Sequence, residues 1–189
     1  MTLSADPLLV TIDTCVWIEF IDNNTRAQEV AQILEWHVQG LIQVVVSNRV
    51  FDPDVQSAEN RRALTKLFSQ HRIQIVPSAF RWGFSRLSCG DVLNGLATLR
   101  SGSELEKFAK LVGREPATLP KQNIGAKLSN KIGDYDSLRD HYRSGRDVFV
   151  TLDRRDYFAV SKREKYKREL GLIVQDPSEF IALFASQDL

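Results

Sequence analysis

The feature that most constrains the fold is a pair of short apolar strands that each end in an aspartate. Segment 8–12 (LLVTI) precedes Asp13, and segment 147–152 (DVFVTL) precedes Asp153, so both strands end on the pattern V-T-[I/L]-D. A short continuous run of apolar residues is typical of a strand that is buried on both faces, as in a parallel sheet. The two patterns therefore predict parallel strands with an acidic residue at each carboxyl end.

The rest of the chain alternates similar strands with helical patterns, which predicts an α/β fold. We expect a three-layer α/β/α sandwich around a mostly parallel sheet, built as a single domain over residues 1–189 with a helical insertion at roughly 80–131. The further strands are expected at 41–46, 73–76 and 171–174. The later helices are expected at 104–112, from Asp134 to 144, at 156–170 and at 177–184.

Composition limits the classes of partner and the compartment. Lys and Arg number 25 against 24 Asp and Glu, so nucleic acid could be bound only by local basic patches and not by a field of the whole molecule. Cys15 and Cys89 are the only cysteines, which favours a reduced chain over a disulfide scaffold. No secretory signal and no apolar run of about 20 residues is present. We expect a cytoplasmic protein that does not contact a membrane.

Acids follow several of the expected strands and should meet at one edge of the sheet. Ligands of open α/β sheets bind beyond the carboxyl ends of the strands, near the point where the strand order reverses. Asp13 and Asp153 lie at such ends, and Asp134 is expected to begin the helix that leads into the second strand. Asp52 and Asp54 follow the strand at 41–46. Clustered carboxylates raise one another's pKa, and a divalent cation such as Mg²⁺ or Mn²⁺ relieves the repulsion.

These residues resemble the PIN domain family of metal-dependent ribonucleases, which includes toxin-type members. The resemblance rests on Ile12-Asp13-Thr14 and on the spacing D-x3-L-x6-G-x-D-x-F-x-T-x-D from Asp134 to Asp153. It implies an endoribonuclease that hydrolyses RNA phosphodiester bonds with Mg²⁺ or Mn²⁺. It also implies RNA as the partner, and it leaves open an antitoxin-like protein partner and a homodimer.

The resemblance assigns roles to individual residues. Asp13, Asp134 and Asp153 would be the catalytic, metal-binding acids, and Thr151 a supporting hydroxyl. Pro53 occupies the position at which the family usually has a glutamate, so the fourth acid is taken from its neighbours. We favour Asp54, which could begin the next helix, and keep Asp52 as the alternative.

Each acid also has a structural interpretation. Asp13 and Asp134 could be helix N-caps, and one carboxylate can cap a helix and bind a metal together. Asp136 should face solvent, two residues away from the site face. Asp156 is either a supporting acid of the site or the cap of the basic helix, and capping is favoured.

The remaining candidates lie close to the two acidic strands. Arg154 and Arg155 are expected to bind RNA phosphates, whereas the other basic residues of 156–170 are as well explained by a solvated helix face. Tyr157, Phe158 and Trp82 are candidates for base stacking. His141 is expected to be a buried, hydrogen-bonded residue rather than a proton shuttle. Cys15 is expected to be a small core residue.

Two other functions fit parts of the pattern. A PIN-like fold with a decayed site would serve as an RNA- or protein-binding module, and the uncertain fourth acid keeps this alternative open. A phosphatase with an aspartate nucleophile would use Asp13, but that class needs a second acid where this chain has Cys15.

Overall fold

The computed structural model describes residues 6–51, 57–76, 102–113 and 126–186. Its centre is a five-stranded sheet in which every pair of neighbouring strands is parallel. The strands lie in the order β3-β2-β1-β4-β5. Their bounds are β1 Leu8–Ile12, β2 Ile42–Ser47, β3 Gln74–Val76, β4 Val148–Val150 and β5 Ile173–Gln175.

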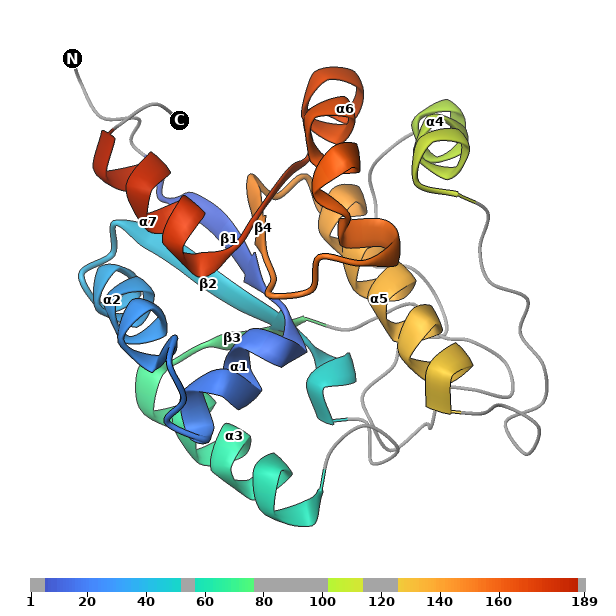
Figure 1. The fold of residues 1–189 in the computed structure, drawn as a ribbon. Coiled ribbons are helices and arrows are strands. Elements are labelled where there is room, and N and C mark those ends of the chain that lie inside the picture. The colour runs from blue at the N-terminus through green and yellow to red at the C-terminus, as the bar shows by residue number, and fades with distance from the viewer. Residues whose placement is uncertain (1–5, 52–56, 77–101, 114–125, 187–189) are drawn as a thin grey trace.

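Helices cover both faces of the sheet (Figure 1). One layer contains α1 Thr14–Ile21, α2 Ala27–Val38, α3 Ala58–His71 and α7 Pro177–Ser186, whose apolar residues share a core with β1, β2 and β4. The other contains α4 Gly102–Val112, α5 Ala126–Arg143 and α6 Val160–Leu170, which share a second core with β4 and β5. Two short 3-10 helices are η1 Asn48–Phe51 and η4 Asp156–Phe158.

This architecture confirms the predicted fold class and the five strands. Strand β1 has the predicted bounds, and the others differ from the prediction by one or two residues at an end. The largest strand difference is at β4, which covers only 148–150 of the predicted 147–152. A continuous apolar run marks a buried strand well, because both faces of a central parallel strand pack against helices.

The helix before β4 begins earlier than predicted. We expected it to begin at Asp134, but α5 begins at Ala126, so Asp134 lies inside the helix and is not its cap. Gly133 led to the wrong boundary, since glycine costs only about 1 kcal/mol in a helix interior. Burial of Ile132 and Tyr135 on either side of this position favours continuing the helix. Of the predicted insertion at 80–131, the structure describes α4 and the first turns of α5.

The strand order reverses between β1 and β4, which pair directly with each other. Thr11 lies opposite Phe149 and Ile12 opposite Val150 in this pair. The backbone N–H of Asp13 continues the ladder by donating to the carbonyl of Val150 at 2.9 Å. The chain therefore places Asp13 and the segment after β4 at the switch point of the sheet, where open α/β folds bind their ligands.

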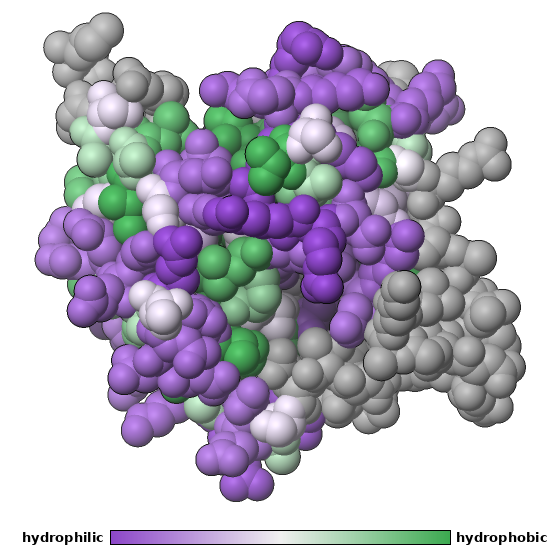
Figure 2. Space-filling view, in the orientation of Figure 1, coloured by the Kyte–Doolittle hydropathy of each residue, from purple (hydrophilic) through white to green (hydrophobic). Residues whose placement is uncertain are grey.

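The visible face of the molecule is largely hydrophilic, most clearly over α6 at the top of the view (Figure 2). Among the described helices, none combines the length and the apolar character that crossing a bilayer requires.

Candidate active site

Asp13 is buried at the end of β1 and uses both carboxylate oxygens. Its Oδ1 accepts a hydrogen bond from the backbone N–H of Thr14 at 2.7 Å, so Asp13 caps α1. Its Oδ2 accepts from the hydroxyl of Thr151 at 2.7 Å and from the thiol of Cys15 at 3.4 Å. The predicted cap is thus confirmed, and the second oxygen faces the segment that follows β4.

Thr151 joins the two acids of the V-T-[I/L]-D patterns. Its hydroxyl oxygen donates to Asp13 and accepts the backbone N–H of Asp153 at 3.1 Å. The Oδ1 of Asp153 accepts from the backbone N–H of Arg155 at 2.8 Å and from its guanidinium Nε at 3.3 Å. The buried threonine therefore fixes where Asp153 leaves the strand relative to Asp13.

Asp134 approaches the same place from α5. Burial, and after it the negative charges of Asp13, Asp153 and Asp156, raise the pKa of its carboxyl to about 8, while the charge of Arg155 opposes them. Its side chain has no hydrogen bond or ion pair with any residue that the structure describes. The carboxylates of Asp13, Asp134 and Asp153 therefore influence one another's charge at this end of the sheet.

The pKa of the Asp13 carboxyl is raised as well. Burial raises the pKa of its carboxyl, and the charge of Asp153 adds to this effect. The hydrogen bonds from Thr151, Thr14 and Cys15 lower the pKa, but they do not cancel the effect of burial. The site thus holds more negative charge than its own cations balance.

Three carboxylates in this arrangement offer hard oxygen ligands of the kind that suits Mg²⁺ or Mn²⁺. Asp13, Asp134 and Asp153 are the described residues that could hold such an ion. In the described part of the chain, no three His, Cys, Asp or Glu side chains are already close enough to form a metal-binding group. The predicted fourth acid, Asp54 or its alternative Asp52, lies outside the described residues.

Two acids near the site differ from their predictions. Asp136 was predicted to face solvent, but it is fully buried and forms ion pairs with Arg139 at 3.1 Å and Arg49 at 3.8 Å. Residues 135–138 are all buried, so α5 packs against neighbouring elements on more than one side and Asp136 does not reach solvent. Asp156 does not cap α6, whose N-cap is Ala159; it is exposed at the first position of η4 with a φ of 44°.

The two arginines predicted to bind RNA have different environments. Arg154 donates to the Oδ2 of Asp176 at 2.5 Å, so an acid after β5 already pairs with it. Arg155 holds Asp153 and leaves 87% of its side chain exposed, so it can reach a ligand beside the acids. Tyr157 and Phe158 are buried, so their prediction as stacking residues is wrong; Trp82 lies outside the described residues.

His141 and Cys15 were both predicted to be structural. His141 is fully buried and its Nδ1 lies 2.8 Å from the hydroxyl of Thr11, which confirms the prediction. Cys15 is only partly buried, and its sulfur contacts Asp13 and lies 3.5 Å from the Thr151 hydroxyl. Cys15 packs against the first core as predicted, at a position beside the candidate site.

Sequence reasoning missed the residues that hold the segment after β4. Arg163 donates to the carbonyls of Phe158 at 3.2 Å and Asp153 at 3.5 Å, and pairs with Glu179 at 2.7 Å. Asp176 and Glu179 form a reciprocal capping box at the start of α7. The D-x-x-E spacing could have indicated this box, whereas nothing distinguishes Arg163 from the other basic residues of its helix.

Comparisons of the chain with protein family models, with characterised proteins and with solved structures found no match.

Proposed function

We propose that the protein is a metal-dependent endoribonuclease whose site is formed by Asp13, Asp134 and Asp153. One observation supports the proposal: at the switch point of the parallel sheet, burial and the negative charges of Asp13, Asp153 and Asp156 raise the pKa of Asp134 to about 8. Strongly perturbed carboxyl groups at a ligand-binding edge are typical of functional sites.

The chain's own residues would have distinct tasks. Asp13 and Asp153 supply fixed oxygens, because Thr151 holds one carboxylate and the backbone of the other. Asp134 must lose its proton before its carboxylate can serve as a ligand. Arg155 places a positive charge next to Asp153, where a phosphate of the RNA would lie. A bound Mg²⁺ or Mn²⁺ would lower the pKa of a water and stabilise the charge that develops on the phosphate.

A second candidate function is a binding module whose catalytic site has decayed. It is favoured by the lack of a preformed group of three metal ligands among the described residues. The phosphatase alternative gains no support, because Cys15 occupies the position at which that class needs a second carboxylate. Burial also raises the pKa of this thiol above its ordinary value, so the thiol does not supply the missing negative charge.

The proposal can be tested with the purified protein and a fluorescently labelled RNA in the presence of Mn²⁺. We expect cleavage by the wild type, loss of cleavage with a chelator, and a loss of about 100-fold or more in Asp13→Asn and Asp153→Asn. Asp22→Asn, which removes an exposed carboxylate at the other end of α1, is the matched control and should cleave as the wild type does.

If cleavage survives in both site variants, the proposal is wrong. If the wild type cuts no RNA but binds it, the decayed module is supported instead.

A further inference from the structure

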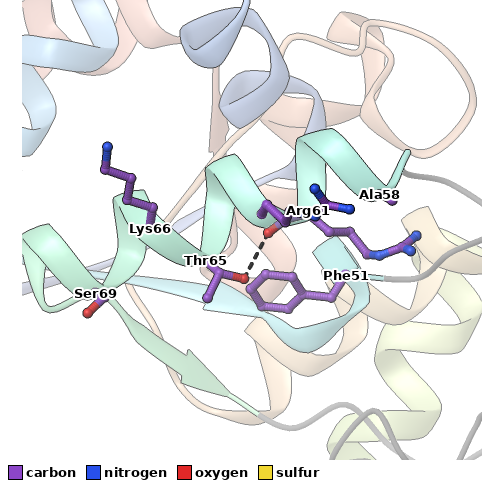
Figure 3. Close-up of a pocket in the computed structure, with 7 residues that line it drawn as sticks. Phe51, Ala58, Arg61, Thr65, Lys66 and Ser69 are labelled. Carbon is purple, nitrogen blue, oxygen red and sulfur yellow. Dashed lines mark hydrogen bonds between the residues drawn. The ribbon is translucent and has the colours of Figure 1, made fainter.

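A second feature of the same edge of the sheet is an open groove along α3. Its volume is about 770 Å³, and it runs from the end of η1 along three turns of the helix (Figure 3). Its lining residues are Phe51, Ala58, Arg61, Arg62, Thr65, Lys66 and Ser69. Phe51 ends the turn that follows β2, and β2 pairs directly with β1. The groove therefore starts beside the strand that carries Asp13.

The charge of the groove has one sign. Among the described residues that line it, Arg61, Arg62 and Lys66 are charged and none is an acid. Arg62 and Lys66 are exposed, and neither forms an ion pair with an acid in the described part of the chain. They are four positions apart, so they lie on one face of α3 about 6 Å apart along its axis. This spacing is comparable with that of neighbouring phosphates in an extended single strand of nucleic acid.

The groove also has an aromatic wall. Phe51 is half-buried and its ring lies 5.7 Å from that of the buried Phe68, in a T-shaped arrangement that fixes its position. The hydroxyl of Thr65 is bonded to the carbonyl of Arg61 at 2.8 Å, so it is turned back onto the helix. Cationic side chains next to a rigid aromatic ring are the features with which proteins bind single-stranded nucleic acids.

We infer that the α3 groove binds one part of a single-stranded RNA while the neighbouring part of that RNA lies in the acidic site. Arg62 and Lys66 would contact its phosphates, and Phe51 would pack against a base. This inference rests on the proposed ribonuclease function. RNA is favoured over a protein segment for two reasons. The chain as a whole has a net charge of only +1, so the groove is a local patch, and its cations are spaced along one line. The groove also begins at the strand edge where the acids lie.

The test measures binding separately from cleavage. Asp13→Asn serves as the background, and the fluorescence anisotropy of a labelled single-stranded RNA of about 16 nucleotides is followed in Mg²⁺ at several salt concentrations. R62Q/K66Q is compared with K107Q/K110Q, which removes the same charge from exposed positions of α4. Thermal melting of each variant verifies that it is folded.

We expect R62Q/K66Q to weaken binding about tenfold and to reduce the slope of log K against log salt by about 1.4, the value for two phosphates of a single strand. K107Q/K110Q should bind as the background does. Equal affinities of the two variants would overturn the inference. So would binding of polyglutamate as tight as that of RNA and equally sensitive to R62Q/K66Q, because the groove would then fit an acidic protein segment.

These outcomes are separate from those of the proposed function. If the wild type cleaves RNA while R62Q/K66Q has no effect on binding, the groove inference fails and the nuclease stands. If binding depends on the groove but the wild type cleaves no RNA, the nuclease fails and the groove inference stands.

Discussion

Asp13 and Asp176 have the same place in the secondary structure and opposite electrostatic environments. Each follows a parallel strand, each caps the helix that comes next, and each is buried, with 8% and 3% of its surface exposed. Yet the pKa of Asp13 is raised and that of Asp176 is lowered. The difference therefore comes from the partners of the two carboxylates.

Burial acts on both acids in the same direction, since it favours the neutral form. At Asp176 burial is outweighed by the hydrogen bond from the N–H of Glu179 and by the ion pair with Arg154. At Asp13 the neighbours are a hydroxyl, a thiol, a backbone N–H and another acid, Asp153. The charge of Asp176 after β5 is thus balanced by other residues of the chain, whereas the end of β1 at Asp13 keeps an excess of negative charge.

The comparison teaches where to look for function in such a sheet. An acid after a strand is by itself only a helix cap, but an acid whose charge the chain leaves unbalanced is a candidate for binding a cation. Asp134, with a pKa of about 8 and no hydrogen bond to the described residues, belongs to the unbalanced end.

The largest expected effect is stabilisation by a divalent cation. An ion present at about 100 times its Kd stabilises the folded protein by about 2.7 kcal/mol, which corresponds to a rise of about 5–10 °C in Tm. Mn²⁺ titrations followed by thermal melting should show this rise in the wild type and in Asp176→Asn. It should be lost in Asp134→Asn. If Mn²⁺ does not raise the Tm of the wild type, the unbalanced charge near Asp13 does not bind a cation, and the contrast with Asp176 is wrong.

Loss of the Thr151 hydroxyl should have the next largest effect. Thr151→Val removes the donor to Asp13 and the acceptor for the N–H of Asp153, which we expect to cost about 1–3 kcal/mol. Because this hydroxyl lowers the pKa of Asp13, its loss should also raise that pKa, which NMR titration would measure. Thr151→Ser keeps the hydroxyl and should restore both quantities. A serine variant as unstable as the valine variant would show that packing of the methyl group is decisive.

In the absence of a metal ion, replacing Asp134 and replacing Asp176 should change the free energy of unfolding in opposite directions. The folded-state pKa of Asp134 is raised from 3.8 to about 8, so its contribution to stability is complete below about pH 4 and is lost as the pH rises towards 8. Asp134→Asn should therefore be more stable than the wild type at pH 8, by about 1 kcal/mol or more, and the difference should vanish near pH 4.

Asp176→Asn provides the opposite sign. The pKa of Asp176 is lowered, so its contribution is present above pH 4 and is lost as the pH falls below that value. We expect this variant to be destabilised by about 1 kcal/mol at neutral pH, with urea unfolding as the measurement for both variants. Shifts of the same sign would contradict the comparison.

The smallest effect is expected at Cys15. Burial and the neighbouring carboxylate of Asp13 raise the pKa of its thiol, so alkylation at neutral pH should be slow when followed by peptide-resolved mass spectrometry. Cys15→Ala removes weak hydrogen bonds of the sulfur with Asp13 and with the N–H of Leu152, and should change the free energy of unfolding by about 1 kcal/mol or less. Rapid alkylation would mean that the acidic end of the sheet is more open to solvent than its burial indicates.

The sequence by itself determined the parallel sheet and the placement of Asp13, Thr151 and Asp153 at the ends of its strands. This was possible because buried parallel strands are continuous apolar runs, and a residue that follows such a run must lie at the carboxyl edge. The spacing also predicted Asp134 as a candidate acid for this edge, although it wrongly made this residue a helix start.

Which acids form an ion pair with an arginine depends on how the helices pack on the sheet. Asp136 pairs with Arg49 and Arg139, and Asp176 pairs with Arg154, while Asp134 is affected first by burial and then by the repulsion of other carboxylates. The Asp136–Arg49 and Asp176–Arg154 pairs join different elements of the chain, and burial strengthens the effect of such partners on a pKa. Local sequence patterns contain neither quantity, so the division of the acids into paired ones and unbalanced ones emerges only when the helices are packed on the sheet.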